Sequence, residues 1–208
     1  MLNFKAFARA FAKRGIDIRR CEAGTISVEA ILMFPLLLWA YMAMFSFFEG
    51  FRENNINLKA AYTVGDLLSR ETRVINDEYM GGMRDVFGWL TRTPGEVEIR
   101  VTVVAYDEDS DTHRLLWSRD GDGAPGLTQE GVDSVVTPHV PIMANAATAI
   151  VVETWATFEP FMEIGFENTE IYNIVVTSPR FPGHLVYEGL NDGTGTEHDD
   201  GTGEPSDV

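Results

Sequence analysis

Hydrophobic residues follow one another without a charge from Ala30 to Phe48, and no other part of the chain has so long an apolar run. Its nineteen residues, at about 1.5 Å each, extend roughly 28 Å as a helix, close to the ~30 Å hydrocarbon core of a bilayer. Pro35 lies inside the run, and prolines are tolerated in transmembrane helices because neighbouring groups satisfy the freed backbone atoms. The pattern therefore predicts a membrane span over about residues 30–48.

The helical pattern continues beyond the apolar run. No proline occurs between Glu49 and Arg70, and large or amide side chains recur at helical spacing: Phe48, Phe51, Asn55, Leu58, Tyr62 and Leu67. A helix from Thr25 to about Arg70 would be about 70 Å long, which is more than the thickness of a bilayer. We therefore expect residues 25–72 to form the span and its extension, whose outer half lies against an exported domain or a partner.

Residues 73–187 have the pattern of a small α+β domain. Glu96–Val103 alternates apolar and polar residues, which predicts a strand with one buried face in an antiparallel sheet. A second helix is predicted at Asp77–Leu90, and further strands at Leu115–Ser118, Thr148–Phe158 and Glu170–Thr177. Gly131–Ala147 is ambiguous, and its prolines favour a loop. The expected fold class is α+β, with a long N-terminal membrane-spanning helix that extends into a small antiparallel β-sheet domain.

The last part of the chain is poor in apolar residues. From Glu188 to Val208 it is rich in Gly, Asp, Glu and Thr and contains no lysine or arginine. Such a segment buries too little apolar surface to offset its chain entropy. We therefore expect residues 188–208 to form a disordered acidic tail.

Charge is distributed very unevenly. The first 24 residues hold six basic and two acidic side chains, about +4, whereas the rest holds ten basic and thirty acidic ones, about −20, which gives a net charge of −16. Positive charge beside a span stays in the cytoplasm. Residues 1–24 are therefore expected to form a basic cytoplasmic leader, and the acidic remainder is expected to be exported. Because an acidic protein repels phosphate, no nucleic-acid partner is expected.

Other interpretations of the N-terminus remain open. A cleaved secretory signal needs a shorter apolar core and a small-x-small site, but the best late candidate, Tyr41-Met42-Ala43, has a tyrosine where a small residue is needed. A plain signal anchor has no use for Glu29, because a carboxylate at the membrane edge is costly unless it finds a partner. The leader itself is either disordered or an amphipathic helix on the inner leaflet, with Phe4, Phe7, Ala8 and Phe11 on one side.

The segment Cys21–Arg52 resembles the TadE/TadG-like pilus assembly family of bacterial tight-adherence systems. The family pattern is a basic arm, a glycine, a short polar step, a Val-Glu pair, an apolar run with a proline six residues after the glutamate, and an aromatic-Glu-Gly step. In this chain these parts are Arg19 and Arg20, Gly24, Thr25–Ser27, Val28 and Glu29, Pro35, and Phe48-Glu49-Gly50. Ala30 departs from the family, which usually has an aromatic residue there. The C-terminal Val-Val-Glu, Glu-Pro-Phe and Pro-Arg steps are also similar to the family.

The resemblance implies a non-enzymatic minor pilin or pseudopilin of the Flp pilus (type IVb) machinery in the bacterial inner membrane. Its implied partners are a prepilin peptidase, other pilins or pseudopilins, and Tad platform proteins. As in type IV prepilins, the peptidase would cut between Gly24 and Thr25, although not all relatives of the TadG type are processed. Glu29 would then be the fifth residue of the mature chain and would pair with an amine, either its own or that of a neighbouring subunit. The alternative is that Glu29 is merely solvated at the membrane interface.

No motif of a catalytic or phosphate-binding site occurs in the sequence. The histidines are too far apart to suggest a metal site and are expected in loops or the tail: His113, His139, His184 and His198. Asp107, Asp109 and Asp111 alternate like the start of a calcium loop, but Thr112 stands where the glycine is required. A calcium-binding site in this loop, or at Asp120–Gly123, is one interpretation of these acidic residues. The other is a solvated acidic surface without a ligand. We expect no cofactor, no metal and no small-molecule substrate.

A second function is compatible with the same sequence. The chain would then be a membrane-anchored periplasmic binding or scaffold domain that is not incorporated in a filament. A membrane-tethered hydrolase would need a nucleophile and a base close together, and the sequence does not suggest such a pair. The pilus interpretation therefore takes precedence, followed by the scaffold.

Overall fold

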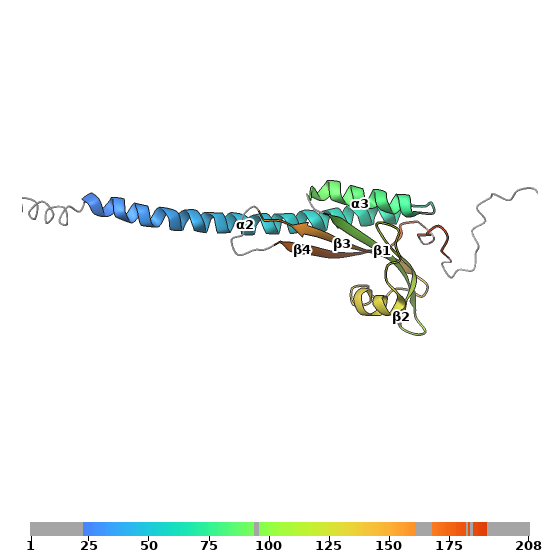
Figure 1. The fold of residues 1–208 in the computed structure, drawn as a ribbon. Coiled ribbons are helices and arrows are strands. Elements are labelled where there is room, and N and C mark those ends of the chain that lie inside the picture. Colours follow the sequence, from blue (N-terminus) through green and yellow to red (C-terminus); the bar gives the residue numbers. More distant parts are fainter. Residues whose placement is uncertain (1–22, 94–95, 161–167, 182, 184, 191–208) are drawn as a thin grey trace, which may run out of the picture. The chain divides into compact units, whose positions relative to one another are not determined.

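The computed structural model describes residues 23–93, 96–160, 168–181, 183 and 185–190 (Figure 1). These residues fall into two compact units, an N-terminal unit up to Glu49 and a sheet unit from Gly50 onwards. A long apolar helix is followed by a small open antiparallel sheet of four strands, so the α+β layout is confirmed. The leader up to residue 22 and the tail from residue 191 lie outside the described residues.

The first described helix, α2, extends over Ala23–Arg70 without a break at Pro35. The predicted helix from Thr25 to Arg70 is therefore confirmed. Within the sheet unit α2 is amphipathic, because its buried residues recur every three or four positions: Asn57, Ala60, Ala61, Val64, Leu68 and Ser69. A Cβ at Gly65 would lie 3.6 Å from Val175 and 3.9 Å from Val152, so this face of α2 packs directly on the sheet.

The second helix, α3, extends over Asp77–Thr91, close to the predicted Asp77–Leu90. It begins where the side chain of Asn76 accepts a hydrogen bond of 3.0 Å from the backbone of Tyr79, which satisfies one free amide of the first turn. It ends at Arg92, which adopts a left-handed conformation. Met80 and Phe87 are its fully buried residues, and they join α3 to the same core as α2.

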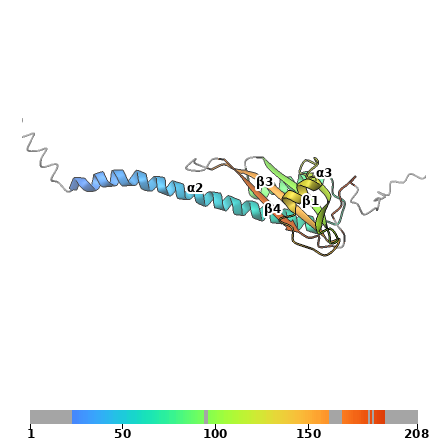
Figure 2. The same ribbon diagram turned by 90° about the horizontal axis from the view of Figure 1, so that it is seen from below.

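The four strands are β1 (Val97–Asp107), β2 (Thr112–Asp120), β3 (Thr148–Phe158) and β4 (Thr169–Thr177). They form an antiparallel sheet in the order β2-β1-β3-β4. Figure 2 shows β1, β3 and β4 from a second side. The predicted positions of β3 and β4 are confirmed within one residue. The predictions for β1 and β2 were too short, because the hairpin continues to pair up to Asp107 and Thr112.

The β1–β2 ladder contains a bulge. Val103 pairs with Trp117, but the next residue, Val104, pairs with Leu115, so Leu116 has no partner in this ladder. Trp117 lies in the core beneath the helices, and its indole Nε1 donates a hydrogen bond of 2.7 Å to the carbonyl of Leu185. The bulge therefore positions an aromatic anchor for the C-terminal segment.

The sheet is buried on both faces over part of its length. One face carries Ile99, Val101, Val103, Ile150, Val152 and Val175, which pack with α2 and α3. On the other face Val104, Ala149 and Val151 pack with Val132, Val136 and Val140. Since Thr102 and Val104 on this second face are fully buried, the prediction that β1 has only one buried face is wrong for this part of the strand.

The second core explains a further correction. Gly131–Ala147 was ambiguous in the sequence, and its prolines favoured a loop, but it begins with the end of a short helix, α4 (Gln129–Gly131), and a π-helix, η1 (Val132–Val136). The amide of Thr137 donates to the carbonyl of Val132 at 2.9 Å, the i to i+5 bond of a π-turn. Valines at four-residue spacing form the buried stripe, and the prolines follow only after the helix has ended.

The C-terminal segment is bound to the sheet unit. The amide of Ile75 donates to the carbonyl of Val186 at 3.0 Å, and the amide of Glu188 donates to the carbonyl of Ile75 at 2.8 Å. Leu185 and Tyr187 are buried, and Leu190 packs against the same core. The paired part of the chain therefore extends past residue 188, where the tail was predicted to begin.

Candidate functional site

The predicted processing and assembly residues lie on the N-terminal part of α2. Gly24 and Thr25 belong to its first helical turn, and Glu29 follows Thr25 by four residues, or about 6 Å along the axis. Side chains four residues apart lie on the same face of a helix. The Glu29 side chain is exposed, and no hydrogen bond or ion pair to it occurs within the described part of the chain. The helix therefore places Glu29 within one turn of the predicted cut.

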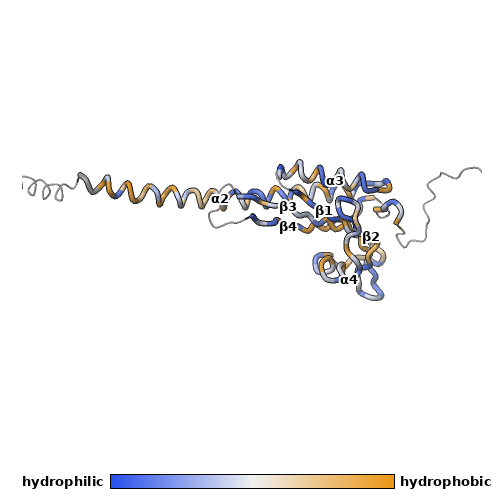
Figure 3. Tube along the Cα trace, viewed as in Figure 1, coloured by the Kyte–Doolittle hydropathy of each residue, from blue (hydrophilic) through white to orange (hydrophobic). Residues whose placement is uncertain are grey.

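The segment around these residues exposes large hydrophobic side chains on all sides. Between Ile26 and Tyr41 the large apolar residues are 50–72% exposed, and only 6% of the most apolar window is buried. Figure 3 shows this part of α2 mainly in the colours of hydrophobic residues. A helix that is apolar all round has no polar face to turn towards water. Within the described residues, α2 is the one helix long and apolar enough to cross a membrane.

The histidines divide between the interior, the surface and the part of the chain that is not described. His113 was predicted in a loop but lies on β2, buried, with its ring centre 5.4 Å from that of Tyr106. His139 is exposed after η1, with its Nδ1 2.9 Å from the carbonyl of Val135. His184 and His198 lie outside the described residues, as does Cys21. No group of three or more potential metal ligands is found among the residues described.

The first acidic loop is held by its own hydrogen bonds. The carboxylate of Asp107 accepts from the amide of Asp109 at 3.1 Å and from the hydroxyl of Ser110 at 2.8 Å. The phenol of Tyr106 donates to the carboxylate of Asp111 at 2.6 Å. These carboxylates therefore close the tight turn between β1 and β2.

A buried polar cluster on the second face of the sheet was not predicted. Arg100 on β1 lies opposite Glu153 on β3, and its Nε and Nη2 atoms donate to the two carboxylate oxygens of Glu153 at 2.8 Å each. Tyr172 on β4 donates a third hydrogen bond of 2.8 Å to the same carboxylate, which is 1% exposed. The guanidinium of Arg100 also lies 4.8 Å from the ring centre of Trp155.

The pKa values in this cluster follow from burial and charge. Burial and the hydrogen bond to Glu153 strongly raise the pKa of the Tyr172 phenol. Burial alone would lower the pKa of Arg100, but its hydrogen bonds and charge interaction with Glu153 more than offset this. In the sequence, Arg100 and Glu153 are opposite charges at polar positions of two predicted strands. They can be recognised as a pair only when the two strands are known to be neighbours.

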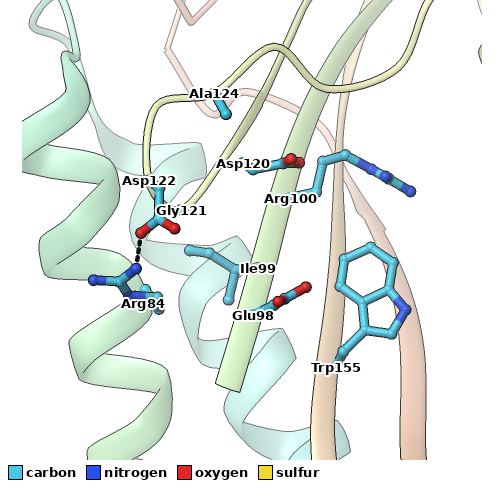
Figure 4. A pocket seen from close by; sticks show the side chains of 9 residues that line it. All are labelled: Arg84, Glu98, Ile99, Arg100, Asp120, Gly121, Asp122, Ala124 and Trp155. Carbon is cyan, nitrogen blue, oxygen red and sulfur yellow. Dashed lines mark hydrogen bonds and ion pairs between the residues drawn. The ribbon is translucent and has the colours of Figure 1, made fainter. Parts of the chain in front are cut away.

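A hollow of about 180 Å³ lies next to this cluster (Figure 4). Its walls come from α3, β1, β3, the end of β2 and the turn that follows β2. They carry, among others, Arg84, Glu98, Arg100, Asp120, Asp122 and Trp155. Arg84 forms an ion pair with Asp122. Burial, together with the charges of Glu98 and Glu153, raises the pKa of Asp120, and Arg100 opposes this effect.

Comparisons of the chain with models of protein families, with curated proteins and with solved structures found no match. A function is therefore inferred from the residues themselves, from the exposed apolar helix and from the polar face of the sheet.

Proposed function

We propose that the chain is a non-enzymatic, membrane-anchored component of a bacterial type IVb (Flp/Tad) pilus assembly system, either pseudopilin-like or a minor pilin. The observation that carries this proposal is the change of character along α2. Its large apolar side chains between Ile26 and Tyr41 are exposed, whereas from Asn57 onwards one face is buried against the sheet. A helix of this kind supplies both a lipid-soluble stem and a structural part of a folded domain.

The proposed topology follows from the charge pattern. Residues 1–24 carry about +4 and the remainder about −20, so the leader stays in the cytoplasm and the sheet unit is exported to the periplasm. The apolar part of α2 crosses the inner membrane once. In a filament, the same apolar surface packs against the helices of neighbouring subunits.

Glu29 has a specific role in this proposal. A prepilin peptidase cuts between Gly24 and Thr25 and creates an amine that is largely protonated at neutral pH. The amine and the positive end of the helix dipole both favour a carboxylate one turn away. Pairing within the chain lowers the cost of a charge at the membrane edge, and pairing with the amine of a neighbour also fixes the register between subunits.

The first test is the N-terminus of the mature protein, measured by mass spectrometry after extraction from the membrane of a host that contains the peptidase. We expect a chain that starts at Thr25. An intact Met1 in that host would remove the processing step from the proposal.

The second test compares Glu29→Ala with Glu78→Gln, a matched loss of charge at an exposed position of α3. Both variants should insert into the membrane normally. Only Glu29→Ala should fail to co-purify with pilus components or to support fibres. Normal fibres with Glu29→Ala would favour the second candidate function, a periplasmic binding or scaffold domain, which the hollow beside Trp155 supports.

A further inference from the structure

The hollow beside Trp155 has an uneven charge balance. Both of its guanidinium groups already have partners, since Arg84 pairs with Asp122 and Arg100 pairs with Glu153. Two carboxylates remain, those of Glu98 and Asp120, and neither side chain has a hydrogen bond or ion pair within the described residues. The unpaired charge that borders the hollow is therefore entirely negative.

The two carboxylates and the indole border the same space. Asp120 lies opposite Arg100 in the β1–β2 ladder, and Glu98 lies opposite Trp155 in the β1–β3 ladder. In Figure 4 the carboxyl groups of Glu98 and Asp120 both turn towards the side on which Trp155 lies, away from the pair formed by Arg84 and Asp122. Asp120 is half-buried, so its carboxylate carries a desolvation cost that an incoming cation would reduce. Glu98 is exposed and adds a second negative charge beside the same space.

We propose that this hollow binds the side chain of an arginine on a basic partner protein, with Glu98 and Asp120 as its counter-ions and the indole of Trp155 as its wall. A guanidinium is planar, stacks on aromatic rings and donates to two carboxylates at once, and it is more weakly hydrated than an ammonium group. The strongly acidic chain, with a net charge of −16, favours a partner of opposite charge.

Size and ligand chemistry separate this occupant from others. A volume of about 180 Å³ is smaller than the ~300–1,000 Å³ of typical small-molecule sites, so one side chain fits where a metabolite does not. Calcium needs six to eight oxygen ligands, and the described residues contain no group of three or more residues placed to hold a metal. A second copy of the chain would bring its own large negative charge and be repelled.

The test uses the full chain in detergent micelles and a blocked Gly-Arg-Gly peptide as the probe. The control peptide carries citrulline, which has nearly the shape of arginine without its charge. Calorimetry should show at least tenfold tighter binding of the arginine peptide, and the indole NMR signal of Trp155 should shift only with that peptide. Equal binding of the two peptides would overturn the proposal.

Two pairs of substitutions locate the site. Glu98→Gln with Asp120→Asn should weaken binding of the arginine peptide at least tenfold. Asp107→Asn with Asp109→Asn removes the same charge from another acidic loop and should leave the affinity within twofold. An equal loss in both would mean that only the overall acidity attracts the probe. If the first pair fails to fold by circular dichroism, Glu98→Gln alone, at an exposed position, should still weaken binding at least threefold.

Two further measurements exclude other occupants. Titration of the wild-type chain with calcium chloride should release no binding heat that depends on Glu98 and Asp120. The Glu98→Gln, Asp120→Asn variant should therefore give the same titration curve as the wild type. Sedimentation at rising protein concentration should show no self-association that depends on these two residues. Either signal would replace the arginine with a metal ion or with a second copy, and the proposal would be wrong.

Discussion

The guanidinium of Arg100 and the carboxylate of Glu153 form a two-pronged ion pair between the central strands β1 and β3, with both hydrogen bonds 2.8 Å long. Arg100 is 20% exposed, whereas Glu153 is 1% exposed. Such a bidentate ion pair is both charge-assisted and directional, because the planar guanidinium matches the geometry of the carboxylate. Arg100 and Tyr172 therefore supply the hydrogen bonds that the buried carboxylate of Glu153 accepts.

Removing one member of this pair should strongly destabilise the sheet. Arg100→Met leaves the carboxylate of Glu153 buried without its cation, and we expect the free energy of unfolding to fall by about 3–5 kcal/mol. Denaturant unfolding in micelles, followed by near-ultraviolet circular dichroism, measures this change. Arg114→Met, at an exposed position of β2, is the control and should change little. The double variant Arg100→Met, Glu153→Leu should regain most of the loss.

Two aromatic residues of α3 should behave in opposite ways. Phe87 is fully buried against the core of α2 and the sheet, so Phe87→Ala leaves a cavity and should cost about 3–5 kcal/mol of unfolding free energy. Trp89, two residues later, is 78% exposed, and Trp89→Ala should stay within about 0.5 kcal/mol of the wild type. Similar losses for the two variants in thermal unfolding would contradict the packing of α3.

Alkaline pH should weaken the contact between α3 and the C-terminal segment. Burial raises the pKa of the Tyr187 phenol to about 12, and the carboxylate of Asp77, which accepts its hydrogen bond, adds to the shift, while Arg119 opposes it. An unfolded tyrosine titrates near pH ~10. Because the folded pKa is the higher one, the stabilisation is complete below about pH 10 and disappears as the pH rises through the folded value.

The matching experiment compares unfolding midpoints between pH 8 and 12 in the wild type and in Tyr187→Phe. We expect the variant to be less stable at pH 8, because the hydrogen bond is gone, and to lose less stability as the pH rises. Part of the alkaline loss should remain, since burial also raises the pKa of Tyr79 to about 12. Parallel curves would show that Tyr187 does not contribute.

Two glycines give a matched pair for substitution by alanine. Gly123 has a φ of +77°, and a Cβ there would collide with the carboxyl group of Asp77, so Gly123→Ala should destabilise the protein by about 1–3 kcal/mol. Gly82 lies inside α3 with open space around a Cβ position, so Gly82→Ala should stabilise the protein by about 0.5–1 kcal/mol. Thermal unfolding of the two variants should therefore shift in opposite directions.

Periodicity along the sequence was enough to locate the helices and the long strand β3. A continuous pattern between caps or breakers identifies α2 and α3, because local spacing alone determines which face is apolar. The π-helix η1 could not be found in this way, since its valines acquire a buried face only when β1 and β3 bring Val104 and Ala149 against them. Long-range pairing likewise determined the ends of β1 and β2.

The same distinction applies to the candidate sites. The role predicted for Glu29 rests on the sequence alone, because it depends on the distance of Glu29 from Gly24 and from the apolar run. The hollow beside Trp155 could not, because Arg84, Glu98, Asp120 and Trp155 come from four separate elements. Their spacing in the sequence gives no hint that they border one space, and only the order of the strands brings them together.

Because of the bulge at Leu116, two odd-numbered residues of β2 can lie on opposite faces of the sheet. His113 and Leu115 face the core that contains η1, whereas Trp117 and Arg119, also at odd positions, face the opposite side. Leu116 alone has no counterpart in this hairpin ladder, so a chain shortened at that position keeps every other pairing. Evolution could therefore drop or restore a residue there without exchanging the inside and outside of the strand, whereas the same change two positions away would break the pairing.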